Sequence, residues 1–335
     1  MARNHSLDNA KFILILLVVF GHMIEPYIEE NRAFKVIYLF LYSFHMPAFV
    51  LVSGMLSKAV LDEGATDRLV RTILVPFIIF TLFYESVYFL ENGHLSKYIK
   101  GLQPYWVLWF FLSLFVWRLL LPVVVKFRHP VVFLIMVSLL AGYFDSIGRF
   151  MGISRTIYFF PFFVVGYLMT ADVLSNLKLN KIPKVIFLAV LGLNIALFSY
   201  FHEMSEDWLL GATSYFDYDV QVWSAGLIRF ALYCLSFLTV MSFLFLVPKG
   251  AGFLSRKGEN SLQAYVWHPI FITVITLSGL SQNTMQLSGP LALIIFFVTA
   301  FVLSAMLSSN FVMSATQRFL ISPAIHFLTI LRPRK

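Results

Sequence analysis

Lys11 and His22 are the residues whose types and spacing best suit group-transfer chemistry. They are eleven residues apart, which is close to three helical turns, so on a helix they share one face about 16 Å apart along the axis. An imidazole takes and returns a proton near neutral pH, and an ammonium attracts anions. Asp8, three residues before Lys11, can pair with it on that face. Because Asp8 is about 21 Å from His22, we expect the group that orients the imidazole to come from another helix.

Three further ionisable residues are candidates for the same cavity. A charged side chain at the centre of a bilayer costs at least about 2.5 kcal/mol, so each one indicates a cavity or a buried partner. His45 lies at nearly the depth of His22, and antiparallel neighbouring helices bring two such histidines together. Glu85 and His268 either line the cavity or bridge helices. The alternatives are that His22 is a neutral core histidine and that His45 marks a kink before Pro47.

Arg68 and Arg71 form a candidate phosphate clamp. They are three residues apart at the start of an apolar stretch, and two guanidinium forks on one helix face suit a phosphate. The alternative is an ordinary pair of cations at the cytoplasmic end of a span. Arg155 and Arg229 lie at the opposite ends of predicted helices, where we interpret them as snorkelling to the interface.

The composition indicates what kind of scaffold positions these residues. Of 335 residues, 59% are apolar and 13% are charged, against roughly 25% charged in globular domains. This excludes a soluble protein, a disordered chain and a nucleic-acid-binding protein. We interpret the net charge of +8 as membrane topology. Cys234 is the single cysteine, so an internal disulfide is excluded, and no metal site is expected.

The apolar runs predict an all-α, polytopic membrane bundle of about ten transmembrane helices. At about 20 residues per span, they leave no separate soluble domain, so residues 1–335 form one transmembrane domain. The connections on the side of both termini hold 18 of the 25 Lys and Arg residues, which predicts cytoplasmic termini. The runs at 131–145 and 157–171 are short for a span. The ten runs are 12–28, 34–57, 69–90, 104–122, 131–145, 157–171, 183–201, 225–247, 262–280 and 290–314.

Six groups of residues, in order along almost the whole chain, resemble the acyltransferase 3 family of integral membrane O-acyltransferases, in particular its fucose 4-O-acetylase-related branch. The family's first motif usually has Arg where this chain has Lys11, a change that keeps the charge but loses the bidentate fork. The groups are Ser6-Leu7-Asp8-Asn9-Ala10-Lys11 with His22; Phe44-His45-Met46-Pro47 with Ser53-Gly54; Arg68-Leu69-Val70-Arg71 with Pro76; Trp109-Phe110; Phe160-Pro161-Phe162-Phe163 with Gly166; and Gly258-Glu259-Asn260-Ser261-Leu262 with Tyr265 and His268-Pro269.

The resemblance implies an enzyme of the plasma membrane that acetylates surface polysaccharide. The donor would be cytosolic acetyl-CoA, used as a substrate rather than held as a permanent cofactor, and the acceptor a hydroxyl of an extracytoplasmic or lipid-linked glycan. His22 would be the catalytic residue, and Lys11, Arg68 and Arg71 would bind the donor. Direct transfer and an acetyl-histidine intermediate both remain open. The rival interpretations are a transporter or flippase and a structural membrane subunit.

Overall fold

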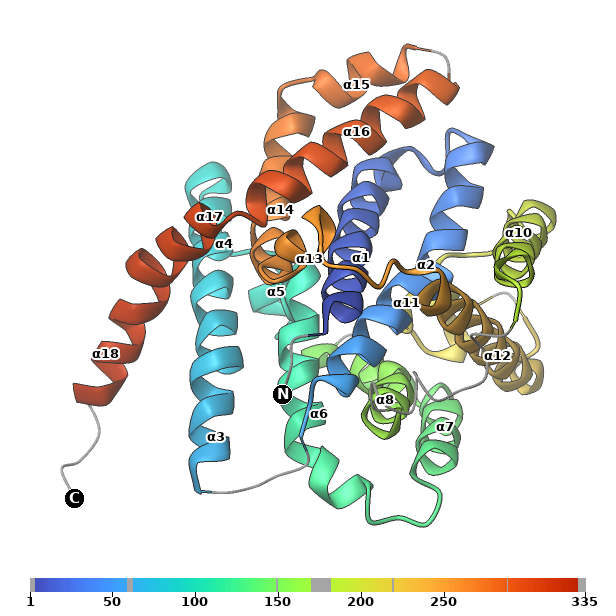
Figure 1. Ribbon diagram of the computed structural model, residues 1–335, viewed down its shortest axis with the longest axis horizontal. Helices are drawn as coiled ribbons and strands as arrows, with labels where there is room; N and C mark the ends of the chain where they lie inside the picture. Colours follow the sequence, from blue (N-terminus) through green and yellow to red (C-terminus); the bar gives the residue numbers. More distant parts are fainter. Residues whose placement is uncertain are drawn as a thin grey trace.

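The computed structural model describes residues 4–58, 63–148, 150–169, 182–218, 220–287 and 289–330, and the regular structure within them is helical (Figure 1). Ten apolar helices account for the ten apolar runs, which confirms a polytopic helical membrane protein. Seven are long and apolar enough to cross a bilayer: His5–Tyr27, Arg32–Met55, Gly64–Asn92, Trp106–Val124, Phe150–Leu168, Val222–Leu246 and Gly289–Leu307. The shorter apolar helices are Pro130–Ala141, Lys184–Tyr200 and Ser261–Leu277.

One expectation about the short runs is wrong. The run at 131–145 is indeed a short helix, but the run at 157–171 belongs to a span that begins at Phe150. Its extra length comes from residues 150–156, which include Ser154, Arg155 and Thr156. Hydropathy alone does not assign such polar residues to a span.

The helices keep the labels of Figure 1. In chain order they are α1 (His5–Ile24), α2 (Arg32–Met55), α3 (Glu63–Leu69), α4 (Val75–Asn92), α5 (Lys97–Lys100), α6 (Trp109–Val124), α7 (Pro130–Ala141), α8 (Ile153–Leu168), α10 (Lys184–Tyr200), α11 (Asp207–Leu210), α12 (Val222–Leu246), α13 (Phe253–Gly258), α14 (Ser261–Leu277), α15 (Leu280–Met285), α16 (Gly289–Leu307), α17 (Asn310–Thr316) and α18 (Ser322–Ile330).

Helices α1 and α2 lie side by side at the centre of the molecule (Figure 1). Helix α2 also packs along α8, and glycines bring the two backbones into contact. A methyl group on Gly54 would lie 2.0 Å from the carbonyl oxygen of Phe163, and one on Gly166 would lie 1.9 Å from that of Leu51. Small residues at such crossings are the usual way in which membrane helices approach closely. The two glycines therefore set the spacing of α2 and α8.

The start of α1 is held by α13 and the loop before it. The side-chain amide of Asn9 donates hydrogen bonds to the carbonyl oxygens of Pro248 at 2.7 Å and Gly250 at 3.0 Å. Gly258 packs so tightly that a methyl group there would lie 1.8 Å from the carbonyl oxygen of Asp8. These contacts explain why asparagine and glycine occupy these positions, and they give α1 a fixed register.

Arg229 does not snorkel to the interface as the sequence analysis expected. Its side chain is 2% exposed, and it donates to the carbonyl oxygen of Ser138 at 3.1 Å. Its guanidinium also lies 4.4 Å from the ring centroid of Tyr215. These contacts pin the loop after α11 onto α7, so Arg229 has a structural role.

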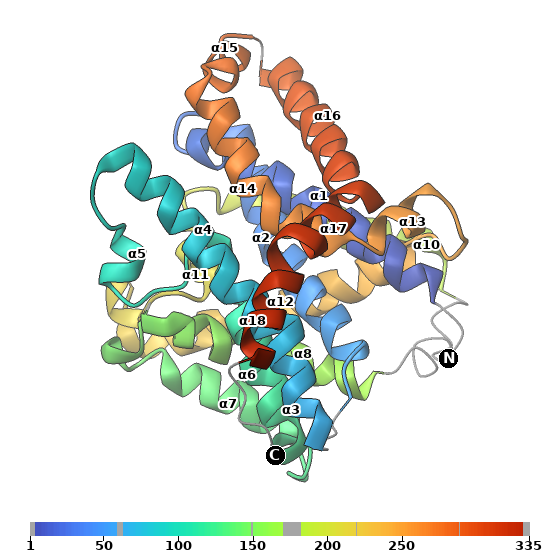
Figure 2. The ribbon, with the colours of Figure 1, turned by 90° about the vertical axis from the view of Figure 1, so that its left-hand side faces the viewer.

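The last predicted run, 290–314, is divided in the structure. Helix α16 ends at Leu307, and the Ser309 hydroxyl caps the next helix by accepting from the Val312 amide at 3.3 Å. Helices α17 and α18 then run beside α3 and α4 (Figures 1 and 2). The indole of Trp267 on α14 donates to the Thr316 hydroxyl at 2.9 Å and anchors α17. Residues 331–335, including Lys335, lie outside the described residues.

Candidate functional site

The orienting partner of His22 lies on the same chain segment and not on another helix. His22 is in the last turn of α1, and its Nδ1 lies 2.7 Å from Oε2 of Glu25. Glu25 is the first residue of a 3-10 turn, Glu25–Tyr27. Pro26 favours this turn because its ring fixes the φ angle. A carboxylate only accepts hydrogen bonds, so the imidazole donates from Nδ1. Its Nε2 is therefore the nitrogen with a lone pair, as a general base requires.

Aromatic rings hold the imidazole from several sides. The hydroxyl of Tyr42 lies 3.3 Å from Nδ1 of His22, and the indole of Trp106 has its centroid 4.8 Å from the imidazole. His268 stacks on His22 at 5.5 Å with 17° between the rings, and its own Nδ1 donates to the carbonyl oxygen of Ala264. His268 is fully buried and packs behind His22 without lining the cavity. It is a packing partner of the candidate base.

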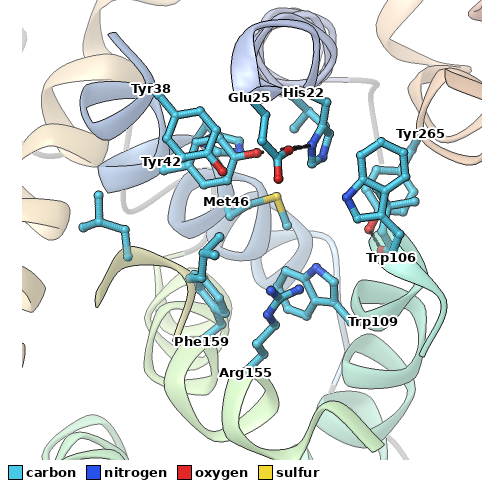
Figure 3. Close-up of a pocket in the computed structure, with 15 residues that line it drawn as sticks. His22, Glu25, Tyr38, Tyr42, Met46, Trp106, Trp109, Arg155, Phe159 and Tyr265 are labelled. Carbon is cyan, nitrogen blue, oxygen red and sulfur yellow. Dashed lines mark hydrogen bonds and ion pairs between the residues drawn. The ribbon is translucent and has the colours of Figure 1, made fainter. Parts of the chain in front are cut away.

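His22 and Glu25 face an inner cavity of about 110 Å³ (Figure 3). His45 on α2 lines it too, as antiparallel packing of the first two spans predicts. Nδ1 of His45 lies 2.6 Å from the carbonyl oxygen of Leu41, to which it donates, so His45 also satisfies a backbone group. Segments from six parts of the chain contribute side chains, among them Tyr38, Tyr42, Met46, Trp106, Trp109, Arg155, Phe159, Leu210 and Tyr265.

Arg155 is a site residue that the sequence analysis missed. It lies in the first turn of α8 and lines the inner cavity, with its guanidinium 5.3 Å from the ring centroid of Trp109. Figure 3 shows it pointing into the cavity from the side opposite Glu25 and His22. One signal was available: the helix dipole disfavours a cation in a first turn. An arginine there indicates a role that offsets this cost, and snorkelling does not account for it.

A second, more polar cavity adjoins the first. This vestibule, about 250 Å³ in volume, shares Glu25, Trp106, Trp109, Arg155 and Leu210 with the inner cavity. Its remaining walls come from α5, the loops before α6 and α8, and Ala212 after α11, and its other polar side chains are Lys97, Tyr98 and Gln103.

The backbone around the vestibule is strained. Leu102, Trp106 and Met151 have φ values of 48°, 27° and 49°, a region that costs a non-glycine residue about 1–3 kcal/mol. The amide of Met151 donates to the carbonyl oxygen of Leu102 at 2.9 Å and ties the two loops together. Strain of this kind clusters at functional sites, and here it positions Trp106 against His22.

The arginine pair does not form one clamp. Arg68 lines a third cavity, about 470 Å³ in volume, between α3 and α6, together with Lys58 and Arg118. Arg71 does not line it, and its Nε pairs with Asp67 at 2.8 Å. The reason is a π-helical stretch at Val70–Leu74, whose wider turns send residues three apart in different directions.

Arg118 is the cation that sequence analysis overlooked in this third cavity. It lines this cavity together with Arg68, and its buried Nε has no hydrogen-bond partner within the described residues. Buried N–H groups are rarely left unpaired. Its N–H is therefore available to an anionic ligand beside Arg68.

The remaining candidates lie elsewhere. Asp8 and Lys11 form the expected pair, with Lys11 Nζ 2.7 Å from Asp8 Oδ1, and they line neither of the cavities around His22 and Arg68. Glu85 is buried but does not line the inner cavity. Its carboxylate accepts hydrogen bonds from the backbone amide of Ser96 at 2.8 Å and from the Ser96 hydroxyl at 2.6 Å. Glu85 thus stabilises the turn between α4 and α5, and of the two roles left open for it the structure supports the bridging one.

A family model described as an acyltransferase domain, that of the acyltransferase 3 family, matches residues 4–309. The chain belongs to this family. The model is named for acyl transfer, so membership of this family favours catalysis over transport.

Two curated relatives carry the name nodulation protein NolL. The relative from Mesorhizobium japonicum is 28% identical over 187 residues, which are 51% of this chain and 49% of that protein. The relative from Sinorhizobium fredii is 31% identical over 133 residues, 34% of this chain and 35% of that protein. The aligned part of the chain thus spans about half the length of these relatives or less. No solved structure matches the chain.

Proposed function

We propose that this acyltransferase moves an acetyl group from cytosolic acetyl-CoA to a hydroxyl of a carbohydrate on the outer side of the plasma membrane. The observation that carries the proposal is the His22–Glu25 pair, which faces an inner cavity adjoining a polar vestibule. A carboxylate that fixes Nδ1–H leaves Nε2 as the base, the arrangement expected for deprotonating a hydroxyl. The proposal treats acetyl-CoA as a substrate and assigns no permanent cofactor.

The size of the inner cavity supports a short acyl group. A volume of about 110 Å³ leaves room for a short acyl group such as acetyl beside His22. The vestibule supports a carbohydrate acceptor, because aromatic rings of Tyr98 and Trp106 stand beside polar groups of Lys97 and Gln103. Such a mixture of amphipathic rings and hydrogen-bonding groups suits a sugar ring.

The third cavity supports a CoA donor. Lys58, Arg68 and Arg118 converge there, and guanidinium groups bind phosphate with charge-assisted hydrogen bonds. Lys58 lies three residues beyond the end of α2, and Met55, the last residue of α2, follows His45 by ten residues, about 15 Å along the helix axis. The phosphates of CoA would bind at the cytoplasmic end of α2, and the extended thioester arm would follow α2 to His22.

The proposed step balances as a simple acyl transfer. Nε2 of His22 takes the proton of the sugar hydroxyl while the oxygen attacks the thioester carbon, so a C–O bond forms. The C–S bond then breaks, and the thiolate of CoA receives the proton from His22. In the covalent variant, Nε2 itself attacks the carbonyl carbon and the C–S bond breaks to release the CoA thiolate; the sugar oxygen then attacks the acetyl-imidazole, the C–N bond breaks, and the hydroxyl proton passes to the thiolate.

The direct test gives purified protein radiolabelled acetyl-CoA and a preparation of cell-envelope glycans. We expect alkali-labile acetyl esters on the glycan and release of one free CoA thiol per ester. The matched control is His22→Gln, which keeps the volume and removes the base. Absence of ester formation by the wild-type protein with every glycan fraction, or equal ester formation by the variant, contradicts the proposal.

A further inference from the structure

Acetyl transfer needs a second group besides the base. When the hydroxyl attacks the thioester, the carbonyl oxygen becomes an oxyanion, and donors aimed at this oxygen commonly supply the largest part of the rate acceleration. His22 and Glu25 cannot serve, because one takes the proton and the other is itself an anion. This inference rests on the proposed function and concerns which side chain stabilises that oxyanion.

Several neutral donors of the inner cavity are hydrogen-bonded within the protein. The hydroxyl of Tyr265 donates to the carbonyl oxygen of Val107, and the hydroxyls of Tyr38 and Tyr42 hydrogen-bond each other. Nδ1 of His45 donates to Leu41, which leaves its Nε2 as an acceptor. Among the described residues that line this cavity, Arg155 is the only lysine or arginine.

Arg155 lies where the developing charge would be. It points into the cavity opposite Glu25 and His22 (Figure 3), so a carbonyl bound between them would have the base on one side and the guanidinium on the other. Most of the residues that line this cavity are buried, and a cation beside such a lining acts more strongly than one in water.

The scaffold holds this guanidinium in place before substrate binds. It lies over the ring of Trp109 at 5.3 Å, and α8 is locked against α2 by the contacts of Gly54 and Gly166. Helix α2 carries Tyr42 and His45, so the cation and the opposite wall of the cavity have a fixed spacing. Preorganised charge of this kind needs no rearrangement during the reaction.

We propose that Arg155 is a catalytic residue that donates hydrogen bonds to the oxyanion formed on the thioester carbonyl. As the sugar oxygen forms its bond to the carbonyl carbon, the C=O electron pair moves onto oxygen beside Arg155, and the hydroxyl proton moves to His22. The positive imidazole pairs with Glu25 while the oxyanion pairs with Arg155. The oxyanion then collapses, the C–S bond breaks and the thiolate takes the proton.

The experiment compares Arg155→Gln and Arg155→Lys with the wild-type protein, and measures kcat, the acceptor KM and the Kd of acetyl-CoA. Removing one oxyanion donor typically lowers kcat by about 10²–10³-fold, so we expect that loss in Arg155→Gln and a smaller one in Arg155→Lys. The Kd of acetyl-CoA and the pH dependence of kcat are expected to stay unchanged. Guanidinium ion added to Arg155→Ala is expected to restore part of kcat. The control is Arg128→Gln, which removes an exposed arginine from the loop between α6 and α7.

Each other outcome has a distinct meaning. A rise in the acceptor KM at unchanged kcat contradicts the proposal and makes Arg155 a substrate anchor. A wild-type kcat in Arg155→Gln also overturns it, and leaves the proposed function standing. A folded variant is recognised by an unchanged Kd for acetyl-CoA, and loss of donor binding in all three variants overturns the catalytic role. If the wild-type protein itself leaves acetyl-CoA intact, the proposed function fails and this proposal fails with it.

Discussion

At the scale of single residues, the site depends on His22, whose two ring nitrogens have different roles. Nδ1 of His22 is held 2.7 Å from Glu25, and Nε2 is left for substrate. A carboxylate beside an imidazole fixes the tautomer and stabilises the charged ring that forms during proton transfer. The two residues are one turn apart, so the pair needs no second helix to assemble.

We predict that His22→Ala abolishes acetyl transfer while acetyl-CoA binding persists. General-base catalysis contributes about 10²–10⁴-fold, so the loss should exceed any packing defect. The measurement is kcat beside the Kd of the donor. His45→Ala is the matched control, since His45 lines the same cavity. Transfer that survives in His22→Ala but is lost in His45→Ala would assign the base to α2.

Glu25→Gln tests the orienting role. The amide keeps the size of the side chain but removes the charge that stabilises the imidazolium, so we predict a fall in kcat of about 10–100-fold, with unchanged donor affinity. Steady-state kinetics beside donor titration measures both. A wild-type kcat in this variant would mean that the short contact with His22 only closes the end of α1.

At the scale of helices, irregular geometry decides which cations meet. The π-helical stretch after Arg68 turns Arg71 towards Asp67, and Arg118 from α6 takes the place beside Arg68. Helix periodicity alone assigns Arg68 and Arg71 to one face. The donor site is therefore built between two helices and not along one.

We predict that Arg68→Ala and Arg118→Ala each weaken acetyl-CoA binding by roughly tenfold or more. A hydrogen bond to a charged group is worth about 1.5–3 kcal/mol, and 1.4 kcal/mol is tenfold in Kd. Arg71→Ala is the control and should change the Kd much less. Isothermal titration with acetyl-CoA measures all three. If Arg71→Ala has the largest effect, Arg71 and not Arg118 contacts the donor.

The contact between α2 and α8 predicts a stability effect. Gly54→Ala puts a methyl group 2.0 Å from the Phe163 carbonyl oxygen, so the helices must separate, and overpacking typically costs about 1–3 kcal/mol. We expect a lower melting temperature in detergent by tryptophan fluorescence. Gly192→Ala is the control, because nothing lies within 4 Å of a methyl group there. An unchanged melting temperature in Gly54→Ala would show that α2 and α8 adjust freely.

At the scale of the whole molecule, the cationic cavity and the vestibule differ in chemistry and in the helix ends beside which they lie. The cationic cavity lies beside the ends of α2 and α3, and the vestibule lies beside the loops before α6 and α8. This arrangement suits a donor and an acceptor that approach from different compartments. The charge distribution of the connections predicts that the cationic side faces the cytoplasm.

We predict that labelling distinguishes the two sides. In a Cys234→Ser background, a membrane-impermeant maleimide should label His94→Cys in intact cells, and Arg128→Cys only after the cells are opened. A reporter that is active only outside the cytoplasm should be silent when fused after Lys335. Labelling of Arg128→Cys in intact cells would reverse the topology and the side from which CoA enters.

The sequence by itself determined the helical membrane class and the ten apolar helices of the described residues, and it singled out His22 as the candidate base, because hydropathy and helical spacing are local properties. It allowed the partner of His22 without identifying it: Glu25 is three residues on, the spacing that also pairs Asp8 with Lys11, but only the structure shows that its side chain turns back to Nδ1. Nor did it show that Arg155 and Arg118 face cavities, because the charge of an arginine near a helix end does not tell which way the helix is turned. Helix packing, set by contacts such as those of Gly54 and Gly166, decides that direction.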